Sequence, residues 1–145
     1  MKYIDLDTLP WYSKQQIAEH QLDRAIRLLL DEQDAISALT LAGAAEEILG
    51  AQVKLAGDKH SVGSFVDECL QVGQRLGENW KYNEFADMLN FTRNALKHYA
   101  DGEDVCVTSE YACHLIDRAI ENLRKLSLEL TQQMRRYCDW RHSQC

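Results

Sequence analysis

An arginine and a histidine five positions apart, Arg93 and His98, are the residues of this chain best suited to chemistry. The guanidinium of Arg93 is a permanent cation that can bind a phosphate, and the imidazole of His98 can gain or lose a proton near neutral pH. A polar residue, Asn94, follows the arginine directly. Together these groups could hold a phosphodiester and move a proton, which is most of what RNA cleavage requires.

The helix that must position this pair is predicted over residues 83–99. Apolar residues recur at helical spacing and predict one buried face, made of Phe85, Met88, Leu89, Thr92, Ala95, Leu96 and Tyr99. On an ideal helix Asn90 and Asn94 lie on the opposite side, and Arg93 and His98 flank them about 140° apart. Because solvated faces are usually rich in Lys and Glu, a strip rich in asparagine favours fixed hydrogen bonding.

The same periodicity predicts four more helices, over residues 13–31, 34–55, 61–76 and 108–137. The last would be about 42 Å long, enough to overhang a four-helix core or to pack on a partner chain. Few glycines, a single proline and no strand pattern favour an all-α fold. We therefore predict one domain over residues 1–145, a bundle of four to five helices with a long C-terminal helix, an N-terminal arm (1–12) and a flexible tail (138–145).

Composition and charge exclude several classes of protein. The chain has 16 Lys and Arg against 23 Asp and Glu, a net charge of −7, which argues against a general nucleic-acid-coating protein. No stretch approaches the roughly 18 apolar residues that span a bilayer, and the acidic N-terminus does not resemble a signal peptide. We expect a cytoplasmic protein with no membrane contact, in which the five cysteines are reduced thiols.

The segment Phe91-Thr92-Arg93-Asn94-Ala95-Leu96-Lys97-His98 resembles the motif helix of the HEPN superfamily. Members of that superfamily are small all-helical domains, and many are ribonucleases of toxin–antitoxin, phage-defence and CRISPR-linked systems. Their signature is an arginine, four to six residues and a histidine, often with a polar residue after the arginine. The segment from Leu41 to Gly50 also resembles a second core helix of the family.

The resemblance implies a metal-independent endoribonuclease without a cofactor. Arg93 would bind the scissile phosphate, His98 would act as general acid or base, and the 2′-hydroxyl of the RNA would be the nucleophile. The cleft would form where two motif helices meet across the two-fold axis of a homodimer, which would concentrate positive charge in an acidic protein. Such a toxin or defence effector would be controlled by a separate antitoxin or nucleotidyltransferase protein. Ala100 stands where some members carry a modified tyrosine, so control by tyrosine modification is not expected.

A plainer explanation of the arginine–histidine pair stands beside this one. The helix dipole alone favours a histidine near a helix C-terminus, by ~0.3–1 kcal/mol, and exposed arginines on helices are common. The alternative function is therefore a non-catalytic HEPN-like helical dimer that binds a nucleotide, an RNA or a protein partner.

Glu46 is the second residue that the sequence singles out. It lies on the predicted apolar face of its helix, and a buried carboxylate requires a partner, for which Arg93 and Arg24 are the candidates. Glu46 could orient Arg93, or it could form a purely structural ion pair. With Asn90, Asn94 and Lys97, it completes the set expected to support Arg93 and His98.

Three residues near the C-terminus could bind zinc by type, namely Cys138, His142 and Cys145. Their spacing matches no strong metal signature, so we expect no metal site.

Overall fold

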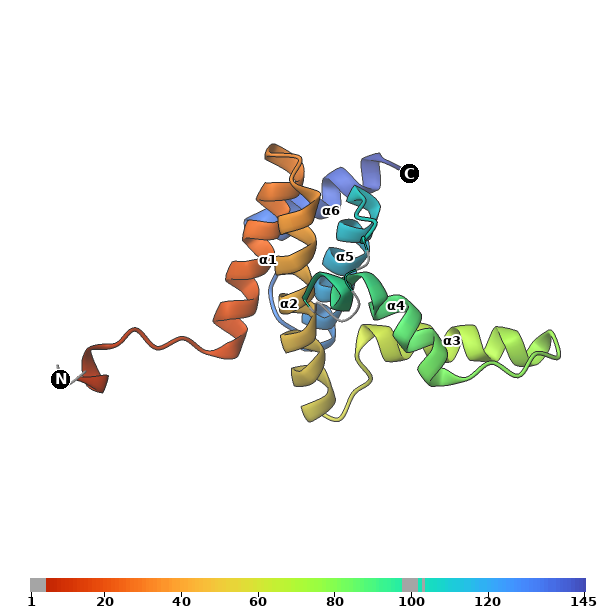
Figure 1. Ribbon diagram of the computed structural model, residues 1–145. Helices are drawn as coiled ribbons and strands as arrows, with labels where there is room; N and C mark the ends of the chain where they lie inside the picture. The colour runs from red at the N-terminus through yellow and green to blue at the C-terminus, as the bar shows by residue number, and fades with distance from the viewer. Residues whose placement is uncertain (1–4, 98–101, 103) are drawn as a thin grey trace.

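The computed structural model describes residues 5–97, 102 and 104–145, and this part of the chain contains only helices (Figure 1). A short 3-10 helix, η1 (Leu6–Thr8), precedes six α-helices. They are α1 (Lys14–Asp31), α2 (Ala35–Leu55), α3 (Ser61–Arg75), α4 (Tyr82–Lys97), α5 (Ser109–Lys125) and α6 (Gln132–Ser143). The predicted all-α helical bundle is confirmed at this level, and the number of helices is larger than predicted.

The hydrophobic core lies between α1, α2 and α5, and α6 packs against α1 at one end (Figure 1). Helix α2 is central because it contacts both α1 and α5 along its length. Small residues on α2 allow these close approaches, and larger aliphatic side chains fill the remaining space. The fully buried residues include Leu22, Ile26, Leu39, Ala42, Leu49, Ile116, Leu123 and Met134.

Side-chain caps mark where most of these helices begin. Ser13 accepts a hydrogen bond from the Gln16 backbone N–H, and the Gln16 side chain accepts one from the Ser13 N–H, which completes a capping box before α1. Asp34, Thr108 and Thr131 cap α2, α5 and α6 through backbone N–H groups of the first turn. These N-cap residues satisfy N–H groups that lack helical partners.

The prediction of one long C-terminal helix over residues 108–137 is wrong. Helix α5 ends at Lys125 because Ser127 adopts a left-handed conformation, with φ of 56°. The Leu128 N–H then donates to the Leu123 carbonyl at 3.1 Å, and the Ser127 N–H donates to the Arg124 carbonyl at 2.9 Å. These two hydrogen bonds form the Schellman motif, which ends α-helices. The sequence concealed this stop because the apolar stripe continues across the break.

The predicted flexible tail is also corrected, since α6 continues through residues 138–143. Trp140 packs against Tyr137, with ring centroids 5.8 Å apart. Arg141 forms an ion pair with Glu110 of α5 at 2.5 Å. These contacts hold the segment on the bundle, which is why it does not behave as an isolated terminal peptide.

Replacing Ser127 with glycine should stabilise the protein by about 0.5–1 kcal/mol. A residue with a Cβ pays a steric cost in the left-handed region that glycine does not pay. Urea unfolding followed by circular dichroism would measure the gain. Ser143→Gly, placed inside the last turn of α6, is the control that should not stabilise; equal effects of the two changes would contradict the explanation.

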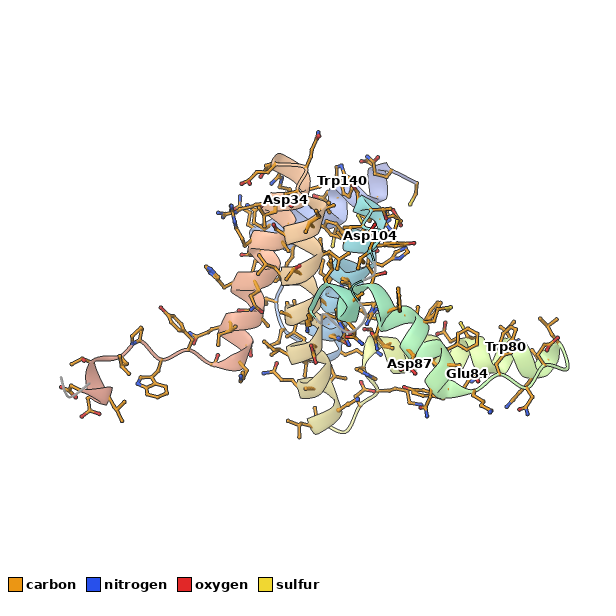
Figure 2. All side chains as sticks on the ribbon, viewed as in Figure 1. Asp34, Trp80, Glu84, Asp87, Asp104 and Trp140 are labelled. Atoms are coloured by element: carbon orange, nitrogen blue, oxygen red, sulfur yellow. The ribbon has the colours of Figure 1, made fainter. Side chains whose placement is uncertain are left out.

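Helices α3 and α4 form a hairpin that projects from the bundle (Figure 1). The outer end is fixed by Trp80, whose ring packs on Gly73 so closely that a Cβ there would lie 2.5 Å from it. Trp80 also contacts Phe85, with ring centroids 5.2 Å apart. Figure 2 labels Trp80, Glu84 and Asp87 along this hairpin and Asp34 and Trp140 on the body of the bundle.

The predicted buried face of α4 is only partly buried in the single chain: most of its members are half-buried, namely Phe85, Leu89, Thr92, Ala95 and Leu96. Met88 of this face is 61% exposed, and Phe91, which the prediction did not include, is 67% exposed. Tyr99 lies outside the described residues. The error has a physical cause: helical periodicity identifies an apolar face but not the surface that covers it. On the part of the chain that the structure describes, nothing covers Met88 and Phe91.

In the described ranges, no helix is both long enough and apolar enough to cross a bilayer.

Candidate functional site

The carboxylate of Glu46 lies between two guanidinium groups that come from different helices. Its Oε2 accepts a hydrogen bond from Arg93 Nη1 at 2.7 Å, and its Oε1 lies 3.1 Å from Arg118 Nη2. The side chain of Glu46 is 2% exposed, and those of Arg93 and Arg118 are 12% and 14% exposed. We refer to Glu46, Arg93 and Arg118 as the Arg–Glu–Arg cluster.

Local sequence explains how three helices meet here. Gly43 lies one turn before Glu46 on α2, and Arg93 crosses α2 directly over it. A Cβ atom at Gly43 would lie only 2.7 Å from Arg93 Cγ, so a side chain there would push α4 away. The glycine thus lets the aliphatic part of Arg93 lie flat on α2 while its guanidinium reaches Glu46.

Arg118 ties α5 to α4 as well as to Glu46. Its Nη2 donates to Asn90 Oδ1 at 2.7 Å, and its Nη1 donates to the Leu89 carbonyl at 3.2 Å. Its Nε is buried and has no acceptor within the described part of the chain. Arg118 therefore fixes two consecutive residues of α4 and, through them, the position of Arg93.

The cluster carries a net charge of +1 because two guanidiniums share one carboxylate. Burial lowers the pKa of Arg118, Glu46 opposes that change, and the neighbouring charge of Arg93 adds to it. Two cations held this close in a mostly dry environment attract a second anion. The arrangement is thus suited to binding an anionic group such as a phosphate.

The structure brings together most of the residues that the sequence predicted as supporting ones. Asn94 Oδ1 accepts a hydrogen bond from Arg93 Nε at 3.3 Å, and Asn90 joins the cluster through Arg118. Lys97 forms an ion pair at 2.5 Å with Glu47, the residue next to Glu46. The other predicted site residue, His98, lies outside the described residues.

Of the two candidate partners for Glu46, Arg93 is the one that binds it. Arg24 instead pairs with Glu32 at 3.2 Å, on the surface of α1. The prediction that Glu46 has a cationic partner is confirmed, and the part of this ion pair in any reaction stays a prediction.

Sequence reasoning missed Arg118. It directly precedes Ala119 of the apolar stripe of α5, so its position looked like that of any charged residue beside a buried face. One signal was available in the sequence: Asn122, four residues later, places a second polar side chain on the same side of the helix. Two polar residues one turn apart on the edge of a core face indicate a polar interface with another helix.

The candidate zinc ligands do not assemble into a site. Cys138 and His142 line a pocket between α5 and α6, together with Asp117 and Glu121. Across the described ranges, no group of three or more His, Cys, Asp or Glu residues has a geometry that could hold a metal ion.

Comparison of the chain with protein-family models, with curated proteins and with solved structures finds no significant match.

Proposed function

We propose that this protein is a metal-independent endoribonuclease of the HEPN type, which acts as a homodimer in the cytoplasm. In this proposal it is a toxin or defence effector controlled by a separate antitoxin or nucleotidyltransferase protein. Arg93 binds the scissile phosphate, and His98 acts as general acid or base. The 2′-hydroxyl of the RNA loses its proton and attacks the adjacent phosphorus, the bond to the 5′-oxygen breaks, and that oxygen is protonated. The products are a 2′,3′-cyclic phosphate and a 5′-hydroxyl.

One observation carries the proposal: the helix with the arginine–histidine motif exposes apolar side chains on one side and contributes Arg93 to a cationic cluster on another. Met88 and Phe91 of α4 are largely exposed, and Arg93 of the same helix belongs to a cluster with a net charge of +1. Pairing two copies through α4 would cover the apolar residues and bring two such clusters together. An acidic chain would then present a local basic cleft to RNA.

A specific observation favours the second candidate, a non-catalytic helical dimer that binds nucleotide, RNA or protein. The guanidinium of Arg93 is only 12% exposed and already bound to Glu46. In this role the ion pair is a structural joint between α2 and α4, and the dimer provides a binding surface without chemistry.

The test is RNA cleavage by the purified protein in EDTA, with analysis of the product ends. We expect cyclic-phosphate ends, and a loss of at least about 100-fold in rate for Arg93→Ala and for His98→Ala. Arg93→Ala should remain folded because Arg118 still neutralises Glu46. Arg27→Ala, an exposed arginine of α1, is the matched control that should cleave normally. RNA that stays intact across protein concentration and pH would reject the nuclease and favour the second candidate.

A further inference from the structure

The two helices of the α3–α4 hairpin expose large apolar side chains that the fold of the single chain does not use. Five of them leave about half of their surface or more open to solvent: Phe65 (50%), Val72 (49%), Leu76 (69%), Met88 (61%) and Phe91 (67%). Scattered exposed apolar residues are normal, but a contiguous apolar patch marks an interaction site. The question is therefore whether these five residues share one face.

On α3 the exposed apolar residues form a single stripe. Phe65, Val72 and Leu76 fall within about 40° of one another on an ideal helix, and the half-buried Cys69 borders them. The positions 65, 69, 72 and 76 are spaced by four, three and four residues. This spacing is typical of a helix that packs along its length against another helix.

The exposed residues of α4 lie on the same side of the hairpin as this stripe. Trp80 marks the inner sides of both helices, because it packs on Gly73 of α3 and on Phe85 of α4. The α3 stripe is turned from Gly73 by about 80°, and Met88 and Phe91 are turned from Phe85 by about 90° on average in the same rotational sense. Since the two helices of a hairpin run antiparallel, equal turns in the same sense lead to the same side. We call Phe65, Val72, Leu76, Met88 and Phe91 the hairpin face.

The hairpin face points away from the body of its own chain. Arg93, which binds Glu46 of α2, is turned from Phe85 by about 80° in the opposite sense, so the body lies on the other side of the hairpin. The N-terminal arm leaves the body on the side opposite to the hairpin (Figure 1). Within the described ranges, therefore, neither the body nor the arm covers this face.

The area of the face favours a second copy of the chain as its cover. Large side chains present roughly 150–250 Å² each, so Met88 and Phe91 alone offer only about 250 Å² at their observed exposure. Adding the α3 stripe raises the apolar area to roughly 600 Å² per chain, close to the ~800 Å² per partner of a stable interface once a polar rim is included. The wheel places one carboxylate on this side, Glu84, at the start of α4 and thus at the rim. A face without charge at its centre can pair with itself across a two-fold axis.

We propose that the hairpin face joins two copies of the chain, so that α3 and α4 of both hairpins form a four-helix bundle across the two-fold axis. The second copy is the one that the proposed homodimer requires, so this inference rests on the proposed function. It adds α3, a helix without motif residues, as about half of the apolar interface. The dimer is then held together largely by residues that take no part in RNA cleavage.

Val72→Glu combined with Leu76→Glu tests the contribution of α3 and leaves α4 unchanged. We expect the dissociation constant of the dimer to rise at least about 100-fold, because two central apolar residues would become charged. Gln71→Glu combined with Gln74→Glu is the matched control: both glutamines are exposed on α3, and the wheel places them off the hairpin face. The control should change the constant less than about twofold. Analytical ultracentrifugation measures the association, and thermal unfolding checks that each variant is folded.

The native thiol of Cys69 gives a second measurement that needs no substitution. Pairing through the hairpin face would bury Cys69, whereas Cys106 and Cys145 are exposed elsewhere in the chain. Alkylation of Cys69 should therefore be about tenfold slower when about nine-tenths of the chains are dimeric, because only the monomer reacts. Cys106 and Cys145 should react at the same rate at every protein concentration. Mass spectrometry of the alkylated peptides measures the three rates.

The outcomes separate this inference from the nuclease. A Val72→Glu, Leu76→Glu variant that dimerises like the wild type, or a Cys69 that reacts equally at all concentrations, would overturn the hairpin face while RNA cleavage could still stand. A wild-type chain that is monomeric at high micromolar concentration would overturn the second copy and make a different protein the occupant. A dimeric wild type that leaves RNA intact, with both α3 results as expected, would reject only the nuclease.

Discussion

Glu46→Gln should lower the free energy of unfolding by about 3 kcal/mol and the melting temperature by about 10 °C. The substitution keeps the shape of the side chain and removes its charge. Arg93 and Arg118 would then lie together, mostly buried, without a counter-ion. Removing one partner of a buried ion pair is costly because the remaining charges are left uncompensated.

Urea unfolding at pH 7, at one fixed protein concentration, measures this effect. Glu32→Gln is the matched control, because it breaks an arginine–carboxylate pair whose side chains are about half exposed (49% and 52%), and it should cost less than about 1 kcal/mol. Adding Arg118→Met to Glu46→Gln should recover part of the loss by returning the net charge to +1. If Glu46→Gln were no worse than Glu32→Gln, the cluster would not carry the buried charge that we describe.

The double substitution Met88→Glu with Phe91→Glu should convert the proposed dimer into a monomer. Central apolar residues of an interface contribute about 2 kcal/mol or more each, so the dimer should weaken by roughly 1,000-fold. The fold should survive because both side chains are largely exposed in the single chain. RNA cleavage should fall in parallel, since in our proposal the cleft needs motif helices from two copies.

Analytical ultracentrifugation over a range of concentrations measures the association, and thermal unfolding checks the fold. Leu55→Glu is the control, because Leu55 is a single apolar residue, 88% exposed, at the end of α2. It should leave both mass and cleavage unchanged. A wild-type chain that is monomeric at high micromolar concentration would contradict the dimer, and cleavage by such a monomer would contradict the shared cleft.

Boundaries of the helices were largely readable from local signals. The N-cap residues Ser13 and Asp34 mark where α1 and α2 begin, and Gly57 marks the left-handed turn after α2. These signals can be read locally because capping and left-handed turns depend on a few adjacent residues. The break at Ser127 was not readable, since serine rarely adopts positive φ and the apolar stripe continues past it. The local sequence there is compatible with a continuous helix and also with a break. The tertiary contacts of α6 with α1 select the break.

Burial was predicted well for the helices that form the core, α1, α2 and α5, and poorly on the α3–α4 hairpin. Leu22, Leu39 and Leu123 recur at helical spacing in the sequence and lie in a core made by their own chain. Met88 follows the same periodicity on α4 and is 61% exposed. A pattern of spacing gives the direction of a side chain relative to its helix axis, and what lies in that direction depends on the other helices.

By itself, the sequence determined that the chain is helical, where the arginine–histidine motif lies, and that Glu46 needs a cation. These properties follow from short-range geometry and from the cost of burying a charge. Only the tertiary structure decided that Arg118 is the second cation and that the start of α3 lies beside the cluster. Both depend on contacts between residues far apart in sequence, Glu46 with Arg118 and Ser61 with Asn122, and no local pattern encodes which distant side chains meet.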